Sequence, residues 1–354
     1  MKNKIVELEQ FFKLNNKMKN TLLISACVLA TLSFFSCKDK KETVATKDSI
    51  RIDSVVSTPL PSWNDGPLKE SIIAFVTKVT KEGSPEFIPV KDRIATFDND
   101  GTLLAEQPVI QGLFAMFVAG EMIKEKPDLA KKNPFKAIAT KDTVYLHHMG
   151  MKELIELVML THTGMSEEKF DAMAKEFFAG AKHPTLHVPV SKLVYQPQVE
   201  LLNYLRANGF KTYIVSGGTV EFMRAVSEEY YGIPPEQVIG SRFGYTFNAD
   251  SNAIVRDSKL FSIDDKETKP VNIQQVIGKR PVFACGNERS GGDIYMLRYS
   301  QGSKYPSYQL LVNHNDAARE FAYQEKDSIS LKWAAKYNFN VVDMQKDWKT
   351  VFVK

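Results

Sequence analysis

The feature that most constrains this chain is a short apolar run at residues 94–97, followed directly by Asp98-Asn99-Asp100-Gly101-Thr102. An apolar run that ends at a Gly turn is typical of a buried strand. Asp98 and Asp100 then stand one residue apart at the carboxyl end of that strand. Open α/β sheets keep their binding sites at this edge. We therefore expect an α/β fold whose chemistry centres on these two carboxylates.

Later segments repeat this pattern of a strand followed by a polar turn. Residues 210–215 end in Ser216-Gly217-Gly218-Thr219, and residues 281–285 end in Gly286-Asn287. Alternation of such runs with helical patterns predicts a doubly wound parallel sheet. We further expect strands at residues 238–240, 310–313 and 340–344, a hairpin at 245–256, and helices at 63–80, 199–207, 220–230, 316–323 and 331–337.

Residues 103–199 read as helices, at 112–124, 151–160 and 166–178. This stretch holds five of the six histidines and no arginine. We expect a mostly helical cap at residues 109–199, inserted into a catalytic core made of residues 63–108 and 200–354.

The N-terminal region has the pattern of an export signal. Residues 21–35 carry no charge and follow Lys17 and Lys19, and the segment is short for a membrane span. Ser33-Phe34-Phe35-Ser36-Cys37 resembles the end of a bacterial lipoprotein signal, with Cys37 as the residue that carries the lipid, so we expect residues 1–37 to be the signal and 38–62 a tether. An ordinary cleaved signal and an uncleaved anchor remain alternatives. Met18 is the expected natural start.

Composition narrows the class of partner. Lys and Arg number 46 against 42 Asp and Glu, a net charge of +4, and the lysines are scattered. Nucleic-acid-binding proteins concentrate basic residues on one face, so we expect no nucleic-acid partner. The three cysteines, at 27, 37 and 285, make no disulfide framework and no metal-binding cluster.

Two carboxylates at this spacing can divide a reaction, with one attacking while the other transfers a proton. A phosphoryl group suits them, provided that Mg²⁺ with hard oxygen ligands neutralises its charge. Ser216-Gly217-Gly218 adds a hydroxyl and close-approach backbone N–H groups, which can cradle an anion. The alternatives are an ordinary Asp-Gly turn and a helix cap.

Four motifs follow one another along the chain. The first is Asp98–Thr102, the second Ser216–Gly218, the third Asp264–Pro270 before a helix, and the fourth Gly286–Asp293 after a strand. In this order they resemble the motifs of the haloacid dehalogenase superfamily. The resemblance covers residue 63 to the C-terminus. It is to the branch with a helical cap of the C1 type, near the phosphoserine-phosphatase-like hydrolases. It implies a Rossmann-like core with the cap between the first and second motifs.

The resemblance also implies roles for individual residues. Asp98 would be the nucleophile and Asp100 the general acid/base. Ser216 and Gly217 would bind the phosphate, and Lys269 would steady both phosphate and nucleophile. The second aspartate favours phosphatases over dehalogenases, because only a phosphatase must protonate an alkoxide leaving group.

Magnesium would be held by the Asp98 side chain, the Asp100 carbonyl and the fourth motif, where Asn287 and Asp293 are the candidates. This motif departs from the family because it is two residues longer than usual. Asn287 offers an amide oxygen but no charge, and Glu288 is a weaker candidate. Whether the lengthened fourth motif binds a metal in the usual way is therefore left as an open alternative.

Glu106 lies eight residues beyond Asp98, one residue out of step with the position where a related phosphatase places a glutamate that meets a substrate amine. Glu106 is thus a candidate substrate contact, although a surface carboxylate before Pro108 explains it equally well. Because the cap lacks arginine, bidentate binding of a substrate carboxylate is not expected, which argues against phosphoserine itself.

Several other positions keep open alternatives. Lys259 and Lys266 rival Lys269, which we favour because Lys-Pro opening a helix resembles the third motif. His147-His148 would face different directions on a helix, so we expect satisfied or solvent-facing rings instead of a metal site or proton relay. The run Asn313-His314-Asn315-Asp316 follows an expected strand and is a candidate for the phosphate edge.

Taken together, these patterns predict an exported Mg²⁺-dependent phosphatase that hydrolyses a small phosphomonoester through an aspartyl-phosphate. It would work in the bacterial periplasm or cell envelope and touch the membrane only through a lipid anchor at Cys37. A phosphotransferase or mutase on the same fold, and a non-catalytic binding lipoprotein with a degenerate metal site, are the alternatives.

Overall fold

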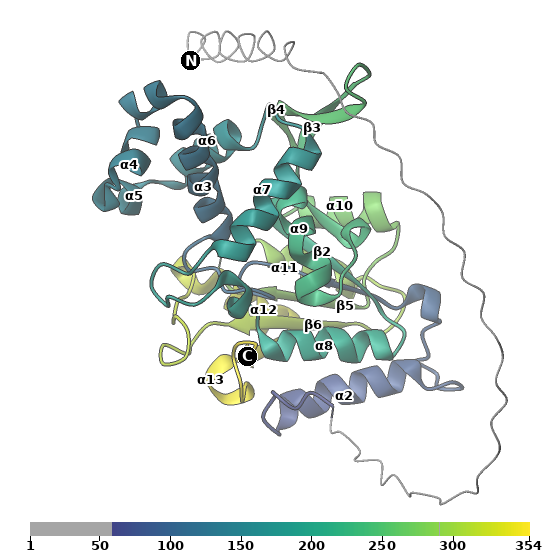
Figure 1. Ribbon diagram of the computed structural model, residues 1–354. Coiled ribbons are helices and arrows are strands. Elements are labelled where there is room, and N and C mark those ends of the chain that lie inside the picture. The colour runs from purple at the N-terminus through teal and green to yellow at the C-terminus, as the bar shows by residue number, and fades with distance from the viewer. Residues whose placement is uncertain (1–58, 290) are drawn as a thin grey trace, which may run out of the picture. The chain divides into compact units, whose positions relative to one another are not determined.

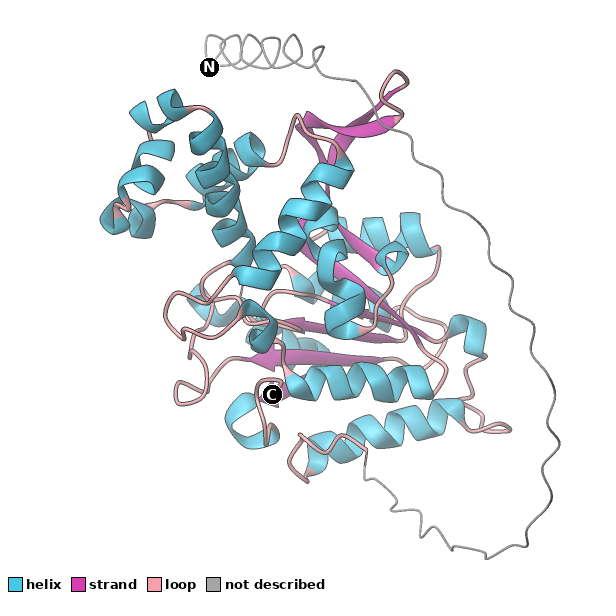
Figure 2. Ribbon diagram, in the orientation of Figure 1, coloured by secondary structure: helices cyan, strands magenta, loops and turns pink. Residues whose placement is uncertain are grey.

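Seven strands form one sheet in the part of the chain that the computed structural model describes, residues 59–289 and 291–354. Their order is β4-β3-β2-β1-β5-β6-β7, and every neighbouring pair is parallel except β3 and β4. The magenta arrows of Figure 2 show this sheet between cyan helices. The strands are β1 (Ile94–Phe97), β2 (Lys211–Thr219), β3 (Val238–Asn248), β4 (Ala253–Ser262), β5 (Phe283–Asn287), β6 (Tyr308–Asn313) and β7 (Asn340–Asp343).

The helices that flank these strands alternate with them along the chain (Figure 1). They are α2 (Pro67–Thr80), α8 (Gln196–Ala207), α9 (Val220–Tyr231), α10 (Thr268–Ile277), α11 (Asp293–Gln301), α12 (Ile329–Tyr337) and the short α13 (Met344–Asp347).

Alternate residues of the central strands point to opposite faces, and helices cover both faces. Phe97 and Phe283 lie in one core cluster with side chains of α2, α8 and α9. Ala284 and Leu311 lie in a second cluster with side chains of α10, α11 and α12. All of β1 and β5 is buried, as expected for inner parallel strands. The predicted doubly wound α/β fold is therefore confirmed.

Between β1 and β2 the chain makes five further helices, α3 (Ile110–Glu125), α4 (Phe135–Thr140), α5 (Thr143–His148), α6 (Met151–Thr161) and α7 (Glu167–Gly180). Helices α3, α4 and α6 share a small apolar core that includes Ala115, Phe135 and Leu157. Figure 1 shows α3–α6 grouped beside the sheet, with α7 nearer to α9. The helical insertion is thus present, and the cap boundaries at residues 109 and 199 stay a prediction.

Two local expectations were incomplete or wrong, and two short helices were not predicted. Residues 316–323 form a turn instead of a helix, because the Asp316 side chain accepts the N–H groups of Ala318 and Arg319, both at 3.2 Å. β3 runs continuously from the parallel sheet into the hairpin, so the strand expected at 238–240 and the first arm of the hairpin expected at 245–256 are one element. The short helices α4 and α5 gave no sufficiently long periodic pattern.

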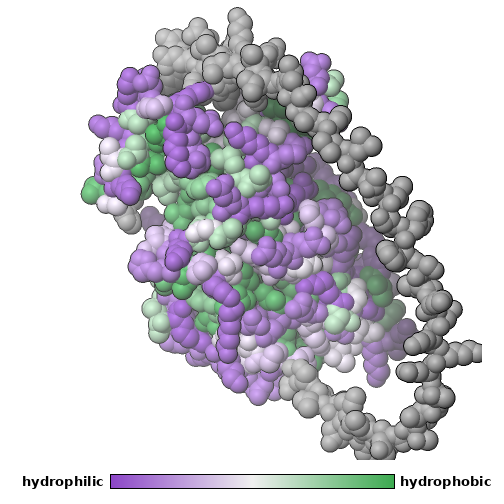
Figure 3. Space-filling view, viewed as in Figure 1, coloured by the Kyte–Doolittle hydropathy of each residue, from purple (hydrophilic) through white to green (hydrophobic). Residues whose placement is uncertain are grey.

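The expected signal, Cys37 and most of the tether lie in residues 1–58, outside the described residues. Among the helices of the described ranges, none combines the length and the apolarity needed to cross a bilayer. The face in Figure 3 mixes hydrophilic residues with smaller hydrophobic areas.

A buried arginine connects the inserted helices to the core. The Arg256 side chain, from β4, lies 3.2 Å from Glu167 on α7 and 3.1 Å from Glu221 on α9. Its guanidinium stacks 3.8 Å above the ring centre of Phe170, and Tyr245 donates a hydrogen bond to Glu221. Burial raises the pKa of Glu167 to about 7, with the Arg256 charge opposing and the Glu221 charge adding to the shift.

This pKa predicts a pH dependence of stability. The folded protein binds a proton at Glu167 more tightly than the unfolded chain, whose value is near 4.5, so Glu167 should lower stability as pH rises from about 4.5 to about 7. Glu167→Gln should therefore gain about 1–2 kcal/mol relative to the wild type between pH 5 and pH 8, after discounting for the 24% exposure of this side chain.

Urea unfolding at several pH values measures this difference. Glu176→Gln, which changes an exposed carboxylate on the same helix, is the matched control and should run parallel to the wild type. Besides Arg256 and Glu221, the charges acting on Glu167 are Arg224 and Glu168. Parallel curves for Glu167→Gln and the wild type would contradict the prediction.

Candidate functional site

The loop after β1 is a tight turn that presents both aspartates at the sheet edge. The N–H groups of Thr102, Leu103 and Leu104 converge on the carbonyl of Asn99 at 3.1, 2.8 and 3.0 Å. Gly101 has a φ of +78°, a left-handed conformation that favours glycine. The N–H of Asp98 donates to the Cys285 carbonyl on β5 at 3.0 Å, which joins the loop to the neighbouring strand.

Lys269, in the first turn of α10, reaches the nucleophile candidate. Its ammonium donates to Asp98 Oδ1 at 2.8 Å, to Asp293 Oδ1 at 2.5 Å and to the Val215 carbonyl at 2.9 Å. The side chain is 3% exposed, and the two carboxylates are 8% and 5% exposed. The rival lysines, Lys259 and Lys266, are both exposed. The structure thus brings the first, third and fourth motifs together through one ammonium group.

The buried charges at this point do not cancel, because two carboxylates share one ammonium. Burial and the nearby Asp293 charge raise the pKa of Asp98 well above its ordinary value, although Lys269 opposes the shift. Burial alone would lower the pKa of Lys269, but the charges of Asp293 and Asp98 raise it above its ordinary value. The excess negative charge fits a hard cation beside Asp98.

Asp100 has the environment of a proton-transfer group. Burial, with the Glu106 carboxylate adding, raises the pKa of Asp100 to about 6. A carboxyl group titrating in this range can serve as both an acid and a base near neutral pH. Asn99 donates to Asp100 Oδ1 at 3.3 Å and in turn accepts from the Tyr231 hydroxyl at 3.0 Å, which fixes the side chain beside the acid.

The second motif lies across from Asp100. Ser216 is buried, and its hydroxyl accepts the Gly218 N–H at 3.2 Å. A Cβ on Gly218 would lie 3.6 Å from both Asp100 Oδ2 and Ser216 Oγ. The backbone of Gly218 therefore lies beside both of these groups. The Gly217 carbonyl accepts from Ser241 at 2.7 Å, which ties the motif to β3. The motif continues β2 through Thr219 with a shift of register, so it is the end of a strand and not a simple helix cap.

The lengthened fourth motif still closes on itself. The Asn287 N–H donates to Asp293 Oδ2 at 2.9 Å, while Asp293 Oδ1 accepts from Lys269. A Cβ on Gly286 would lie 2.4 Å from the Asp293 Cβ, so glycine permits this close return. Glu288 turns to another partner, accepting the Glu325 N–H at 3.4 Å, and it is fully buried.

Glu106 lies in the same cluster, although its partners come from the protein. Its Oε1 accepts from the Asn287 amide at 2.8 Å, and its Oε2 lies 3.0 Å from Arg289 Nη1. The residue is 6% exposed. The structure therefore places Glu106 beside the fourth motif, and its contact with a substrate stays a prediction.

The donor set supports a cation without a dense acidic cluster. Across the described ranges, no three His, Cys, Asp or Glu side chains converge in a metal-binding geometry. A hard cation here would rely on one Asp98 oxygen, the Asn287 amide oxygen and the Asp100 main-chain carbonyl. These three are oxygen ligands of the kind Mg²⁺ prefers, and the excess negative charge beside Asp98 matches its charge.

Two further residues at the site carried little or no signal in the sequence. Gln111, in the first turn of α3, donates to Thr219 Oγ1 at 2.7 Å and accepts the Thr219 N–H at 3.0 Å. This pairing joins the insertion to the second motif. His314 contacts the Gly101 carbonyl at 2.8 Å and Glu320 at 3.0 Å, and Tyr195 donates to the same Glu320. The motif around His314 pointed to this region, whereas nothing in the sequence singled out Gln111.

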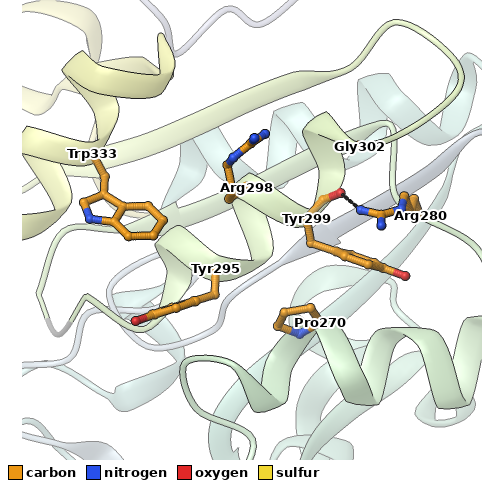
Figure 4. Close-up of a pocket in the computed structure, with 7 residues that line it drawn as sticks. All are labelled: Pro270, Arg280, Tyr295, Arg298, Tyr299, Gly302 and Trp333. Atoms are coloured by element: carbon orange, nitrogen blue, oxygen red, sulfur yellow. Dashed lines mark hydrogen bonds between the residues drawn. The ribbon is translucent and has the colours of Figure 1, made fainter.

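One hollow on the surface of the described residues lies elsewhere. Figure 4 shows aromatic rings and two arginines around it, and Arg280 donates to the Tyr299 carbonyl at 2.7 Å. None of its lining residues belongs to the site around Asp98. The lining residues are Pro270, Arg280, Tyr295, Arg298, Tyr299, Gly302 and Trp333.

Comparison with protein families identifies the class. The model of the haloacid dehalogenase-like hydrolase family matches residues 95–298, which is more than half of the chain. The protein therefore belongs to the haloacid dehalogenase-like hydrolase family. The comparison with curated proteins gives no match.

Among solved structures, a conserved protein of unknown function from Anaerococcus prevotii is similar in fold, with 17% identity, a TM-score of 0.50 and coverage of 77% of this chain and 91% of its own. A protein of unknown function from Bordetella pertussis gives 15% identity, a TM-score of 0.45 and coverage of 72% and 99%. A phosphoserine phosphohydrolase-like protein from Francisella tularensis gives 16% identity, a TM-score of 0.36 and coverage of 69% of this chain and 99% of its own. The last two are distant likenesses only.

Gly101 supplies a direct test of this geometry. A Cβ at Gly101 would lie 1.8 Å from Asn287 Nδ2, so Gly101→Ala must displace the amide in addition to straining a positive φ. Gly83 has the same φ of +78° with nothing within 4 Å of a Cβ, so Gly83→Ala carries the strain alone. We expect a loss of about 1–2 kcal/mol for Gly83→Ala and roughly 2 kcal/mol more for Gly101→Ala.

Urea unfolding of both variants measures the difference. Equal losses of stability would show that the Asn287 amide does not pack against the loop as described.

Proposed function

We propose that this protein is a Mg²⁺-dependent phosphatase that hydrolyses a small phosphomonoester through a phosphorylated Asp98. The observation that carries the proposal is the sharing of Lys269 by Asp98 and Asp293, beside Asp100 and the Ser216 hydroxyl. A nucleophile, a proton-transfer group and anion-binding groups on one sheet edge are the parts that phosphoryl transfer needs. The family match supports a hydrolase, and the phosphoester substrate is the step that we add.

The residues divide the reaction into two balanced steps. Asp98 Oδ attacks phosphorus, the bond from phosphorus to the ester oxygen breaks, and protonated Asp100 gives its proton to the departing alkoxide. Asp100, now a carboxylate, takes a proton from water, and the resulting hydroxide displaces Asp98 from phosphorus to release inorganic phosphate. Lys269, Ser216 and the Gly217 N–H would stabilise the charge on the phosphoryl oxygens.

Mg²⁺, held by Asp98, the Asp100 carbonyl and the Asn287 amide oxygen, would supply positive charge to the phosphoryl group and to the attacking carboxylate. Asp293, which was also expected at the metal, has both oxygens engaged by Lys269 and the Asn287 N–H. Its direct ligation of a metal stays a prediction, and its contacts support a role in holding Lys269.

The cellular location is a second proposal and rests on the sequence alone. The uncharged run before Cys37 and the polar tether after it favour a lipid-anchored envelope protein. Full-length protein expressed with labelled palmitate should carry the label, and Cys37→Ser should lose it. An equal label on both proteins would reject Cys37 as the anchor.

A panel of phosphomonoesters, assayed with and without Mg²⁺, tests the proposed activity. We expect phosphate release from at least one ester with Mg²⁺, and a fall of at least 10³-fold after chelation of the metal or in Asp98→Asn, because the carboxylate nucleophile is removed. Glu176→Gln, changing an exposed carboxylate on α7, is the control and should retain full activity.

The products distinguish the alternatives. A phosphorylated acceptor in place of free phosphate would indicate a transferase or mutase. Binding of a phosphoester without turnover, unchanged in Asp98→Asn, would indicate a non-catalytic binding protein and would overturn the phosphatase.

A further inference from the structure

A buried carboxylate holds the side chain of the one amide proposed as a metal ligand. Glu106 Oε1 accepts a hydrogen bond from Asn287 Nδ2 at 2.8 Å, and both residues are almost fully buried, at 6% and 4% exposure. The same two groups lie against Gly101, with the amide nitrogen 1.8 Å and Glu106 Oε1 2.8 Å from the position that a Cβ would take. Glu106, Asn287 and the nucleophile loop therefore meet at one point.

An asparagine can bind a cation by only one end. Its carbonyl oxygen is a suitable ligand, whereas its NH₂ group is a donor that would oppose a cation. A carboxylate beside the amide decides between the two orientations, because an ionised carboxylate only accepts. With the amide reversed, two oxygen acceptors would face each other at 2.8 Å. Glu106 therefore binds the NH₂ end and leaves Oδ1 as the outward end of Asn287.

The position of Glu106 is itself fixed by a second partner. Arg289 Nη1 lies 3.0 Å from Glu106 Oε2 and 3.4 Å from the Glu106 main-chain carbonyl. Asn287 and Arg289 thus contact different oxygens of the carboxylate, with the Tyr323 hydroxyl as a further polar neighbour. A substrate amine would have to compete with these contacts. The arrangement fits a residue that positions its neighbour better than one that binds a substrate.

We propose that Glu106 is a positioning residue that orients the Asn287 amide so that its oxygen is presented to the metal. The inference rests on the proposed Mg²⁺ site and adds the reason why an amide suffices in the fourth motif. Outer partners that orient metal ligands commonly contribute 10–100-fold to metal affinity. The Glu106 charge acts on the site at a distance in any background, whereas its effect on the orientation of residue 287 exists only while that residue is an amide.

Glu106→Gln is the informative variant. Arg289 needs an acceptor, so the new side chain should turn its oxygen toward Arg289 and its NH₂ group toward Asn287. Asn287 must then offer Oδ1 to that NH₂ group, which removes the oxygen from the metal. We expect Mg²⁺ binding to the substrate-free protein, measured by titration calorimetry, to weaken at least tenfold.

The decisive comparison repeats Glu106→Gln in a protein that already carries Asn287→Asp. A carboxylate has an oxygen at either end, so its orientation does not matter for metal binding. In Asn287→Asp the additional change Glu106→Gln should weaken Mg²⁺ binding much less than it does with Asn287, since no orientation is needed and only the loss of one nearby negative charge remains. Glu200→Gln is the matched control. The Glu200 carboxylate accepts hydrogen bonds from Ser62 at 2.7 and 2.6 Å, away from the site, and its change should leave Mg²⁺ binding unaltered.

The outcomes separate this inference from the proposed activity. If Glu106→Gln binds Mg²⁺ as the wild type does, or weakens binding equally in both backgrounds, the positioning role is wrong and the phosphatase proposal is untouched. If Glu106→Gln raises only the KM for an amine-containing substrate, Glu106 is a substrate contact. If Mg²⁺ binding follows the prediction while no ester is hydrolysed, the phosphatase proposal fails and the positioning role stands.

Discussion

The candidate site depends on one buried ammonium group shared by two carboxylates. Lys269 comes from α10, Asp98 from the end of β1 and Asp293 from the start of α11, so a single side chain joins three elements that are distant in sequence. Removing one partner of such a buried ion pair commonly costs 3–5 kcal/mol, because it leaves a charge without compensation. The charges of the site thus also hold the sheet edge together.

Around this group the core and the insertion contribute different functions. The parallel strands fix the backbone of the first, second and fourth motifs, since Phe97 is in register with both Ile214 and Cys285. The insertion contributes Gln111, which pairs with Thr219 at the start of α9. Arg256 attaches α7 to the same helix through Glu221. These polar contacts, together with aromatic packing of Phe114 and Phe178 on Phe222, connect the inserted helices to the helix that begins at the second motif.

The sheet, and the positions of Asp98 and Ser216 at its edge, could be predicted from the sequence because their signals are local. Asp98 and Ser216 follow apolar runs directly, and such runs are recognisable without knowledge of the fold. The partners of Glu106 were not predictable, because Asn287 and Arg289 lie more than 180 residues away and meet it only in the folded chain. The helix expected at residues 316–323 was wrong for a different reason. The Asp316 side chain accepts backbone N–H groups there and stabilises a turn in place of the helix.

The most direct test of the proposed chemistry is to look for phosphate on Asp98 itself. Protein incubated with Mg²⁺ and a hydrolysed phosphomonoester labelled in its phosphate, then quenched with acid and digested, should yield one labelled peptide containing Asp98. Reduction with borohydride should convert the acyl-phosphate at that position to homoserine. Label at another residue, or turnover without any covalent label in rapidly quenched samples, would contradict attack by Asp98.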